Sequence, residues 1–274
     1  MTETLPHLLV AESSALPMID IVLQSLNEHG SPSSITIVVP RRDHDSFRSR
    51  CQGGPLVVAE EEILPEWPHD RIRCLLPAYP RRAGWYLQQF LKLHFGRAAG
   101  VPRYVVWDAD TVMLASPEYR RNGRTAMNSS REYHEPYFQT YRRLFAEPPV
   151  LTRSVIAQYM LFETAILLEM RDELERRHGH DWIEAVLRAL PGTSASEFSE
   201  YETYANYLES RHPGSIELRR QKWFRYGREV FPKTDATLEE IACRFSGYDY
   251  VAFERHDSSW LKRAAATIIC SIRL

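Results

Sequence analysis

Short apolar runs alternate with helical patterns over the first hundred residues of the chain. Residues 8–11 and 35–39 are almost entirely apolar, which predicts two strands. Between them, residues 17–27 carry apolar side chains at helical spacing, and Gly30 follows as a stop signal. The order strand, helix, strand favours a parallel sheet.

The same patterns predict further elements along the rest of the chain. Strands are expected at residues 56–59, 72–76, 104–107, 221–226 and 250–253, and helices at residues 84–95, 154–177, 181–190 and 199–210. Residues 116–149 are polar, aromatic and rich in arginine and proline, so they are expected to be irregular, with short strands as the alternative. Together these elements predict an α/β fold, with one mixed, mainly parallel sheet flanked by helices in a single domain.

Two carboxylates stand directly after the strand predicted at residues 104–107. Asp108 and Asp110 are two residues apart, so in an extended chain they point to the same side. They would emerge at the carboxyl end of a strand, where open α/β sheets bind ligands. Close carboxylates repel each other unless a proton or a cation joins them. A Mn²⁺ or Mg²⁺ ion that also bridges a diphosphate is the expected occupant, although Asp-x-Asp in isolation is usually a solvated turn.

Polar residues interrupt the apolar helix predicted at residues 84–95. Gln88 and Lys92 are four residues apart and share a helix face, and Gln89 lies beside them. Arg81 and Arg82 precede the helix, where anions are favoured. All five are candidates to bind the diphosphate or sugar of a donor, and a solvated stripe is the alternative for each.

An acidic pair opens the helix predicted at residues 199–210. Ser199 and Glu202 match a capping box, which gives Glu202 a structural explanation. That explanation does not cover Glu200, an acid in a first helical turn. Glu200, with Glu202 close behind it, is therefore the candidate general base that deprotonates a sugar hydroxyl.

A histidine follows the last predicted strand. His256 is a candidate third metal ligand beside Asp108 and Asp110, with Asp249 and Asp257 as nearby alternatives and a surface or core histidine as the ordinary explanation. Weaker candidates for binding sugar or acceptor are Gln158, Glu132, His134 and Glu135.

Composition narrows the class of partner. Net charge is −2 and no basic domain stands out, which argues against nucleic acid as a partner. The four cysteines are far apart and there is no signal-peptide pattern, so a cytoplasmic protein with reduced thiols is expected. Residues 261–274 are expected to form a terminal tail or helix. This segment would give peripheral contact with the inner face of the membrane if the acceptor is lipid-linked.

Three segments, in order, resemble one family. Gly-Trp-Tyr-x-Gln-Gln-x-x-Lys-Leu at residues 84–93, Val-Val-Trp-Asp-Ala-Asp at residues 105–110 and Ser-Glu-Tyr-Glu-x-Tyr at residues 199–204 are similar to nucleotide-diphospho-sugar glycosyltransferases of the GT-A fold, above all a bacterial group. The resemblance runs from about residue 8 to residue 256. It implies a Rossmann-like domain over residues 1–260, with the nucleotide sugar bound by about residues 1–115 and the acceptor by about residues 116–260, on one continuous sheet.

The resemblance also implies roles for particular residues. It places a metal at Asp110 and Asp108, with His256 as a further ligand, and Glu200 or Glu202 near the acceptor. The implied reaction transfers a sugar from a nucleotide-diphosphate sugar to a glycan or lipid-linked acceptor of the bacterial surface or of a secreted polysaccharide. The glutamate pair favours inversion at the transferred sugar.

Two other functions remain open at the level of sequence. Asp108-Ala109-Asp110-Thr111-Val112 also resembles the first motif of haloacid-dehalogenase-type phosphatases, in which the first Asp is the nucleophile. That motif usually follows the first strand, whereas about a hundred residues precede it here, and no late acidic pair for Mg²⁺ is evident. A non-catalytic protein that binds nucleotide sugars is the third hypothesis.

Overall fold

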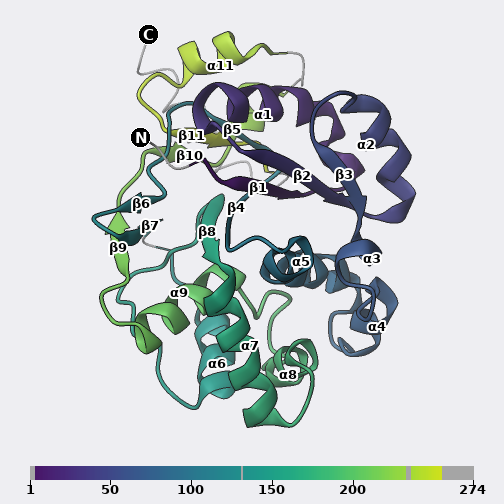
Figure 1. Ribbon diagram of the computed structural model, residues 1–274, viewed down its shortest axis with the longest axis vertical. Coiled ribbons are helices and arrows are strands. Elements are labelled where there is room, and N and C mark those ends of the chain that lie inside the picture. The colour runs from purple at the N-terminus through teal and green to yellow at the C-terminus, as the bar shows by residue number, and fades with distance from the viewer. Residues whose placement is uncertain (1–3, 131, 233–235, 255–274) are drawn as a thin grey trace.

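The computed structural model describes residues 4–130, 132–232 and 236–254 of the chain (Figure 1). Its centre is a five-stranded sheet with the strand order β3-β2-β1-β4-β8. These strands are β1 (Pro6–Val10), β2 (Ser34–Val39), β3 (Leu56–Ala59), β4 (Arg103–Trp107) and β8 (Tyr159–Glu163). The first four run parallel and β8 pairs antiparallel with β4, so the predicted mixed, mainly parallel α/β architecture is confirmed.

Two smaller sheets accompany the central one. The first contains β10 (Trp223–Phe224), β11 (Tyr250–Ala252) and β5 (Thr111–Met113), and the second contains β6 (Arg120–Arg121), β7 (Arg124–Asn128) and β9 (Ile216–Arg219). The expectation of one continuous sheet is therefore wrong. The chain turns sharply after β4, where the Thr111 amide donates to the Asp108 carbonyl, and β5 leaves to pair with β11 instead.

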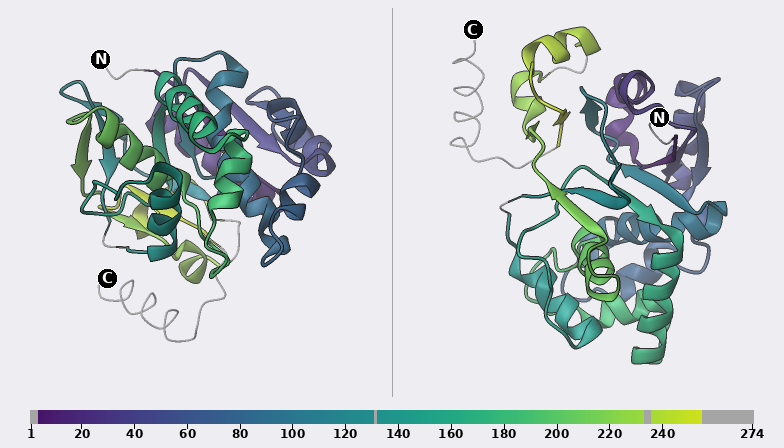
Figure 2. Two further views of the ribbon diagram at one scale, coloured as in Figure 1. Left: turned by 90° about the horizontal axis from the view of Figure 1, so that it is seen from below. Right: turned by 60° about the vertical axis from the view of Figure 1, so that its left-hand side comes forward.

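Helices cover both faces of the central sheet (Figures 1 and 2). One side carries the 3-10 helix η1 (Ser13–Met18), α1 (Ile19–Ser25), the π-helical turn η2 (Leu26–Gly30), the 3-10 helix η3 (Arg41–Asp43), α2 (His44–Arg50), α10 (Gly227–Val230) and α11 (Leu238–Arg244). The other carries α3 (Glu60–Ile63), α4 (His69–Cys74), the 3-10 helix η4 (Pro80–Arg82), α5 (Ala83–Ala99), α6 (Glu135–Phe145), α7 (Thr164–His178), α8 (Trp182–Ala189) and α9 (Glu200–Arg211). We call α6, α7, α8 and α9 the helical lobe.

Alternation along β4 explains why its sequence is a continuous apolar run. Tyr104 and Val106 belong to the core on the side of α5, whereas Val105 and Trp107 belong to the core on the side of α1. Successive side chains of a strand point to opposite faces, and both faces of this strand are covered. Burial of both faces fixes the register of β4 and hence the place where Asp108 and Asp110 emerge.

Three of the predicted elements differ in the structure. Residues 72–76 were expected to form a strand, but Ile72 to Cys74 belong to helix α4, which follows Pro68 and buries only Ile72 deeply. The helix expected at residues 154–177 begins at Thr164, because residues 159–163 form β8 at the edge of the sheet. The region expected to be irregular, with short strands as the alternative, contains the short strands β6 and β7 and also the unexpected helix α6. Short apolar runs fit either kind of element, and tertiary pairing decides between them.

Helix α5 packs tightly enough to position its side chains. A Cβ atom added at Gly96 would lie 2.2 Å from the Thr164 Oγ1 atom and 2.6 Å from the Tyr104 ring, so a glycine is required for this close approach. The helix ends at Gly100, whose φ of 66° gives the left-handed cap that favours glycine. None of the helices in the described residues is long and apolar enough to cross a membrane.

Candidate active site

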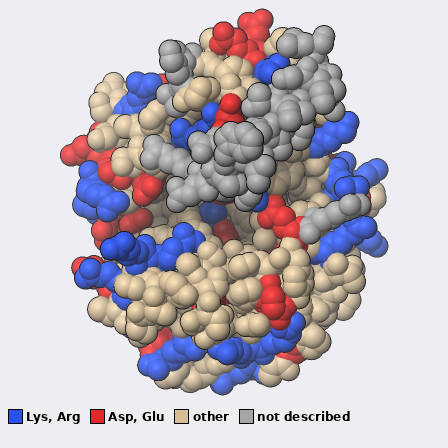
Figure 3. Space-filling view, turned by 180° about the vertical axis from the view of Figure 1, so that it is seen from behind, with Lys and Arg blue, Asp and Glu red and all other residues tan. Residues whose placement is uncertain are grey.

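A cavity of about 800 Å³ opens at the carboxyl edge of the central sheet. Residues that follow the parallel strands line it: Glu12 after β1, Arg42 after β2, Glu60 after β3, and Asp108 and Asp110 after β4. The opposite wall consists of the α5 side chains Trp85, Gln88, Gln89 and Lys92 and the start of α9. In the space-filling view, acidic and basic side chains gather around a hollow near the middle of one face (Figure 3). The parallel strands end together at this edge, which is the usual position of a ligand site in open α/β sheets.

Asp108 and Asp110 both line the cavity, as the sequence predicted. The Asp108 amide donates to the Gln158 carbonyl at 2.9 Å, which ties the turn to the segment before β8. Burial, and then the charges of Asp108 and Glu254, raise the pKa of Asp110 to about 7. A carboxyl group with so high a pKa lies where negative charge is poorly neutralised.

Glu254 is a third acid at this corner, and the sequence analysis missed it. The Phe253 amide donates to the Asp110 carbonyl at 2.8 Å, so the end of β11 runs beside the two aspartates. The Glu254 carboxylate accepts a hydrogen bond from Gln158 Nε2 at 2.7 Å and pairs with Arg225 at 3.2 Å. Burial raises the pKa of Glu254, as does the charge of Asp108, while Arg225 opposes the shift. His256, the metal ligand expected from the sequence, lies outside the described residues.

The donor atoms at this corner suit a hard divalent cation. Carboxylate oxygens are the ligands that Mg²⁺ and Mn²⁺ favour, and a cation would neutralise the acids that raise the pKa of Asp110. Within residues 4–254 as described, no group of three or more His, Cys, Asp or Glu side chains is arranged to hold a metal. Asp108 and Asp110 present carboxylate oxygens, which are the kind of ligand that such a cation binds.

A buried ammonium group joins Asp108 to Glu200. Lys92 Nζ donates to Asp108 Oδ1 at 2.8 Å and to Glu200 Oε1 at 2.9 Å, and its side chain is 6% exposed. Burial by itself would lower the pKa of Lys92, but the charges of the two carboxylates outweigh it, and the pKa lies well above its ordinary value. Asp108, predicted to bind the metal and the donor, and Glu200, predicted to act as the base, are thus connected through Lys92.

The two glutamates at the start of α9 occupy different environments. Ser199 Oγ accepts from the Glu202 amide at 3.3 Å, which is the serine half of the capping box expected from the sequence. The Glu202 carboxylate binds the Ser154 hydroxyl and the Val155 amide, away from the residues that line the cavity, and burial raises its pKa to about 7. Glu200 lines the cavity directly, which makes it the better placed of the two candidate bases.

Among the polar residues of the α5 region, some line the cavity and others bind neighbouring parts of the protein. Arg81 and Gln88 line the cavity. Gln89 also borders it, but its side-chain oxygen accepts from the Glu200 amide at 3.0 Å. Arg82 donates to the Ala195 carbonyl and the Ser196 hydroxyl, and its guanidinium lies 4.3 Å from the centre of the Trp85 ring. Arg82 therefore holds the loop before α9.

Other residues of the cavity were missed or weakly predicted from the sequence. Arg42 and Glu60 follow β2 and β3 closely, so the rule that ligands bind at the carboxyl ends of strands identifies them in retrospect. Burial, and then the charge of Glu61, raise the pKa of Glu60 to about 7. The weaker candidates Glu132 and Gln158 do line the cavity, whereas no pattern in the sequence marks Arg225 and Arg228, which line it too.

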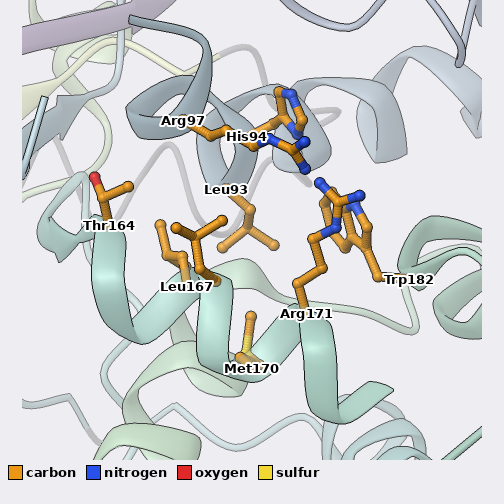
Figure 4. A pocket seen from close by; sticks show the side chains of 9 residues that line it. Leu93, His94, Arg97, Thr164, Leu167, Met170, Arg171 and Trp182 are labelled. Atoms are coloured by element: carbon orange, nitrogen blue, oxygen red, sulfur yellow. The ribbon is translucent and has the colours of Figure 1, made fainter. Parts of the chain in front are cut away.

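A second, apolar cavity lies between α5 and α7 (Figure 4). Leu93, Leu167, Met170 and Trp182 surround it, with Arg97 and Arg171 at its edge. Its volume of about 20 Å³ accommodates no more than about one water molecule. It is therefore too small for a sugar or nucleotide. The polar cavity that Asp108, Asp110 and Glu200 line is the candidate active site.

Comparison with known proteins places the chain in a family. It belongs to the family described as "Family of unknown function (DUF6492)", whose model matches residues 4–225. A search of curated proteins finds no match. Among solved structures, the chain is similar to the crystal structure of mouse xyloside xylosyltransferase 1 in its apo form, with 12% sequence identity, a TM-score of 0.47, and coverage of 91% of this chain and 97% of that chain. We draw no functional conclusion from a likeness at this level.

Proposed function

We propose that the protein is a divalent-metal-dependent glycosyltransferase, which transfers a sugar from a nucleoside-diphosphate sugar to a glycan or glycolipid acceptor. The observation that carries the proposal is the meeting of three separate sequence segments at one cavity. The α5 residues Gln88 and Lys92, the pair Asp108 and Asp110, and Glu200 all line it. These are the segments that resemble glycosyltransferases of the GT-A fold.

In the proposed reaction, Asp108 and Asp110 would hold Mn²⁺ or Mg²⁺ at the cavity. The cation would neutralise charge that develops on the departing diphosphate. Arg81, at the exposed rim of the cavity, supplies a further positive charge toward the donor or acceptor. A cavity of about 800 Å³ has room for a nucleotide sugar.

Glu200 is the proposed general base. The acceptor hydroxyl gives its proton to the Glu200 carboxylate while its oxygen forms a bond to the anomeric carbon of the donor sugar. The bond between that carbon and the diphosphate oxygen breaks, and the diphosphate leaves with the electron pair. Attack from the side opposite the leaving group inverts the anomeric centre, so inversion is the stereochemical outcome we propose.

A thermal-shift screen of UDP, GDP, ADP and TDP with and without Mn²⁺ tests the proposal. A ligand that binds only the folded protein raises the melting temperature. We expect a rise of several degrees that requires both a nucleoside diphosphate and Mn²⁺ and that is lost in Asp110→Ala. The matched control is Asp172→Asn, because Asp172 is an exposed acid on α7, far from the cavity lining.

Three outcomes separate the competing functions. Equal stabilisation of wild type and Asp110→Ala would contradict the proposed metal site. Turnover of a phosphate monoester that disappears in Asp108→Asn would favour the phosphatase instead. Metal-dependent nucleotide-sugar binding, without hydrolysis of the donor or transfer to a wide panel of acceptors, would favour a non-catalytic binding protein.

A further inference from the structure

Lys92 has an unusual position for a residue expected to bind a diphosphate. Its amine already contacts two carboxylates, Asp108 at 2.8 Å and Glu200 at 2.9 Å. The ring of Tyr201, centred 5.0 Å from the amine, closes another side. The ammonium group therefore lies at the cavity wall between two carboxylates and an aromatic ring.

We propose that Lys92 is a positioning residue that links the metal-side carboxylate of Asp108 to the acceptor-side carboxylate of Glu200, and that it does not bind the donor diphosphate. The inference rests on the proposed function, since it assigns a role within the same site.

The hydrogen bonds show how such a link would position each carboxylate. Lys92 binds Oδ1 of Asp108, and Oδ2 makes no hydrogen bond to any described residue. The Asp108 side chain is 26% exposed toward the cavity, so one oxygen is fixed by the lysine and the other is left for a cation. On the opposite side, the same amine fixes Oε1 of Glu200, whose side chain is 8% exposed.

Helix α5 holds Glu200 at two points. Gln89 accepts from the main-chain amide of Glu200, and Lys92 binds its carboxylate. Gln89 and Lys92 are three positions apart and so lie on one face of the helix. This arrangement explains why two long polar side chains are buried on an otherwise apolar helix, with exposures of 2% and 5%. The start of α9 and the end of β4 are joined through α5.

Electrostatics gives this role a distinctive consequence. Lys92 Nζ already binds Asp108, so its positive charge would repel a divalent cation bound by that carboxylate, and removal of the ammonium would strengthen metal binding. Without Lys92, Asp108 would also be less well oriented, and this would weaken metal binding. Loss of a group that orients a metal ligand typically lowers metal affinity by about 10- to 100-fold. We expect the repulsion to be the larger effect, because it acts on a doubly charged ion. Glu200 meanwhile loses the group that holds its carboxylate toward the acceptor.

The experiment compares the full-length wild type with Lys92→Met and Lys92→Arg. Affinity for Mn²⁺ alone is measured by electron paramagnetic resonance, affinity for UDP and GDP in saturating Mn²⁺ by calorimetry, and turnover as hydrolysis or transfer of the donor. For Lys92→Met we expect about tenfold tighter Mn²⁺ binding, together with about 100-fold slower turnover and unchanged nucleotide affinity. Lys92→Arg keeps the charge, so its Mn²⁺ affinity and its turnover are expected to lie between those of Lys92→Met and wild type.

A second variant guards against a failure to fold. Lys92→Met with Glu200→Gln removes one positive and one negative charge, so no buried carboxylate is left without a partner at Glu200. The same tightening of Mn²⁺ binding is expected, because Asp108 has again lost its ammonium. A Mn²⁺ affinity equal to that of wild type in both variants would overturn the proposed role.

The outcomes also distinguish this inference from the proposed function. Weaker binding of UDP and GDP by Lys92→Met, with Mn²⁺ affinity unchanged, would show that Lys92 contacts the diphosphate and would overturn the inference alone. A wild-type protein that binds neither Mn²⁺ nor nucleotide would overturn the proposed function and the inference together.

Discussion

Acidic side chains cluster at two places: around Arg211 in the helical lobe and around the cavity at the sheet edge. The two clusters differ in how well nearby positive charges neutralise the carboxylates. In the lobe, Arg211 contacts Glu147 at 2.9 Å and Glu173 at 2.7 Å. The hydrogen bond from Arg211 lowers the pKa of Glu173 to about 2. At the cavity, burial and neighbouring acids raise the pKa of Asp110 to about 7.

The difference separates charges that stabilise the folded state from charges that destabilise it. A carboxylate with a lowered pKa stabilises the folded state at neutral pH, whereas one with a raised pKa destabilises it. The cavity keeps Asp108, Asp110 and Glu254 close together although the apoprotein would be more stable without that crowding. Such costs are expected where a ligand supplies the missing charge.

The largest expected effect on stability is the loss of the arginine in the lobe. Arg211→Met leaves Glu147 and Glu173 without their shared partner, and we expect the free energy of unfolding to fall by about 3 kcal/mol. Urea denaturation at pH 7 measures it. The control is Arg188→Met, because the exposed pair of Arg188 with Glu184 should contribute less than about 1 kcal/mol. Equal losses in the two variants would show that the lobe cluster is no better matched than an ordinary surface pair.

Asp110→Asn tests the opposite character of the cavity, with a smaller effect. The folded state holds the Asp110 proton more strongly than the unfolded state, because its pKa rises from 3.8 to about 7. Stability is therefore lost as pH rises from about 4 to 7. The variant cannot ionise, so we expect the metal-free protein to gain about 2 kcal/mol at pH 8 and little at pH 4. Asp172→Asn, the surface control, should show no gain at either pH. A destabilised Asp110→Asn protein at pH 8 would contradict the comparison.

The sequence predicted the part of the site that local pattern determines. A buried apolar strand fixes where Asp108 and Asp110 emerge, and a helix start with a capping serine fixes Glu200. Both features depend on a few neighbouring residues, so periodicity and capping chemistry were enough to find them. The mainly parallel sheet followed from the order of the first elements.

The remainder depends on contacts between distant segments. Glu254 reaches Asp110 through the pairing of β11 with β5, and Arg225 reaches the cavity from beside β10. Nothing local marks either residue as part of a site. The same holds for β8, whose apolar run is continuous with helix α7 in sequence and becomes a strand because β4 offers it an edge. Lys92 was predicted to bind the donor, and its burial between two carboxylates could not be read from the sequence.

The smallest effect concerns the pH dependence of the lobe cluster. Glu173 has a pKa of about 2 in the folded protein, below its ordinary value of 4.5, because Arg211 stabilises its ionised form. The folded state thus holds the proton less strongly, and the resulting stability is present above about pH 4.5 and is lost as pH falls toward 2. Glu173→Gln should cost about 1 kcal/mol at pH 7, since the amide keeps a hydrogen bond but loses the charge. Urea denaturation of both proteins at pH 7, 4 and 3 measures the difference, which should shrink steadily toward acid. A difference that stays constant over this range would mean that shape, and not charge, makes Glu173 favourable, and the contrast with Asp110 would then rest on the cavity alone.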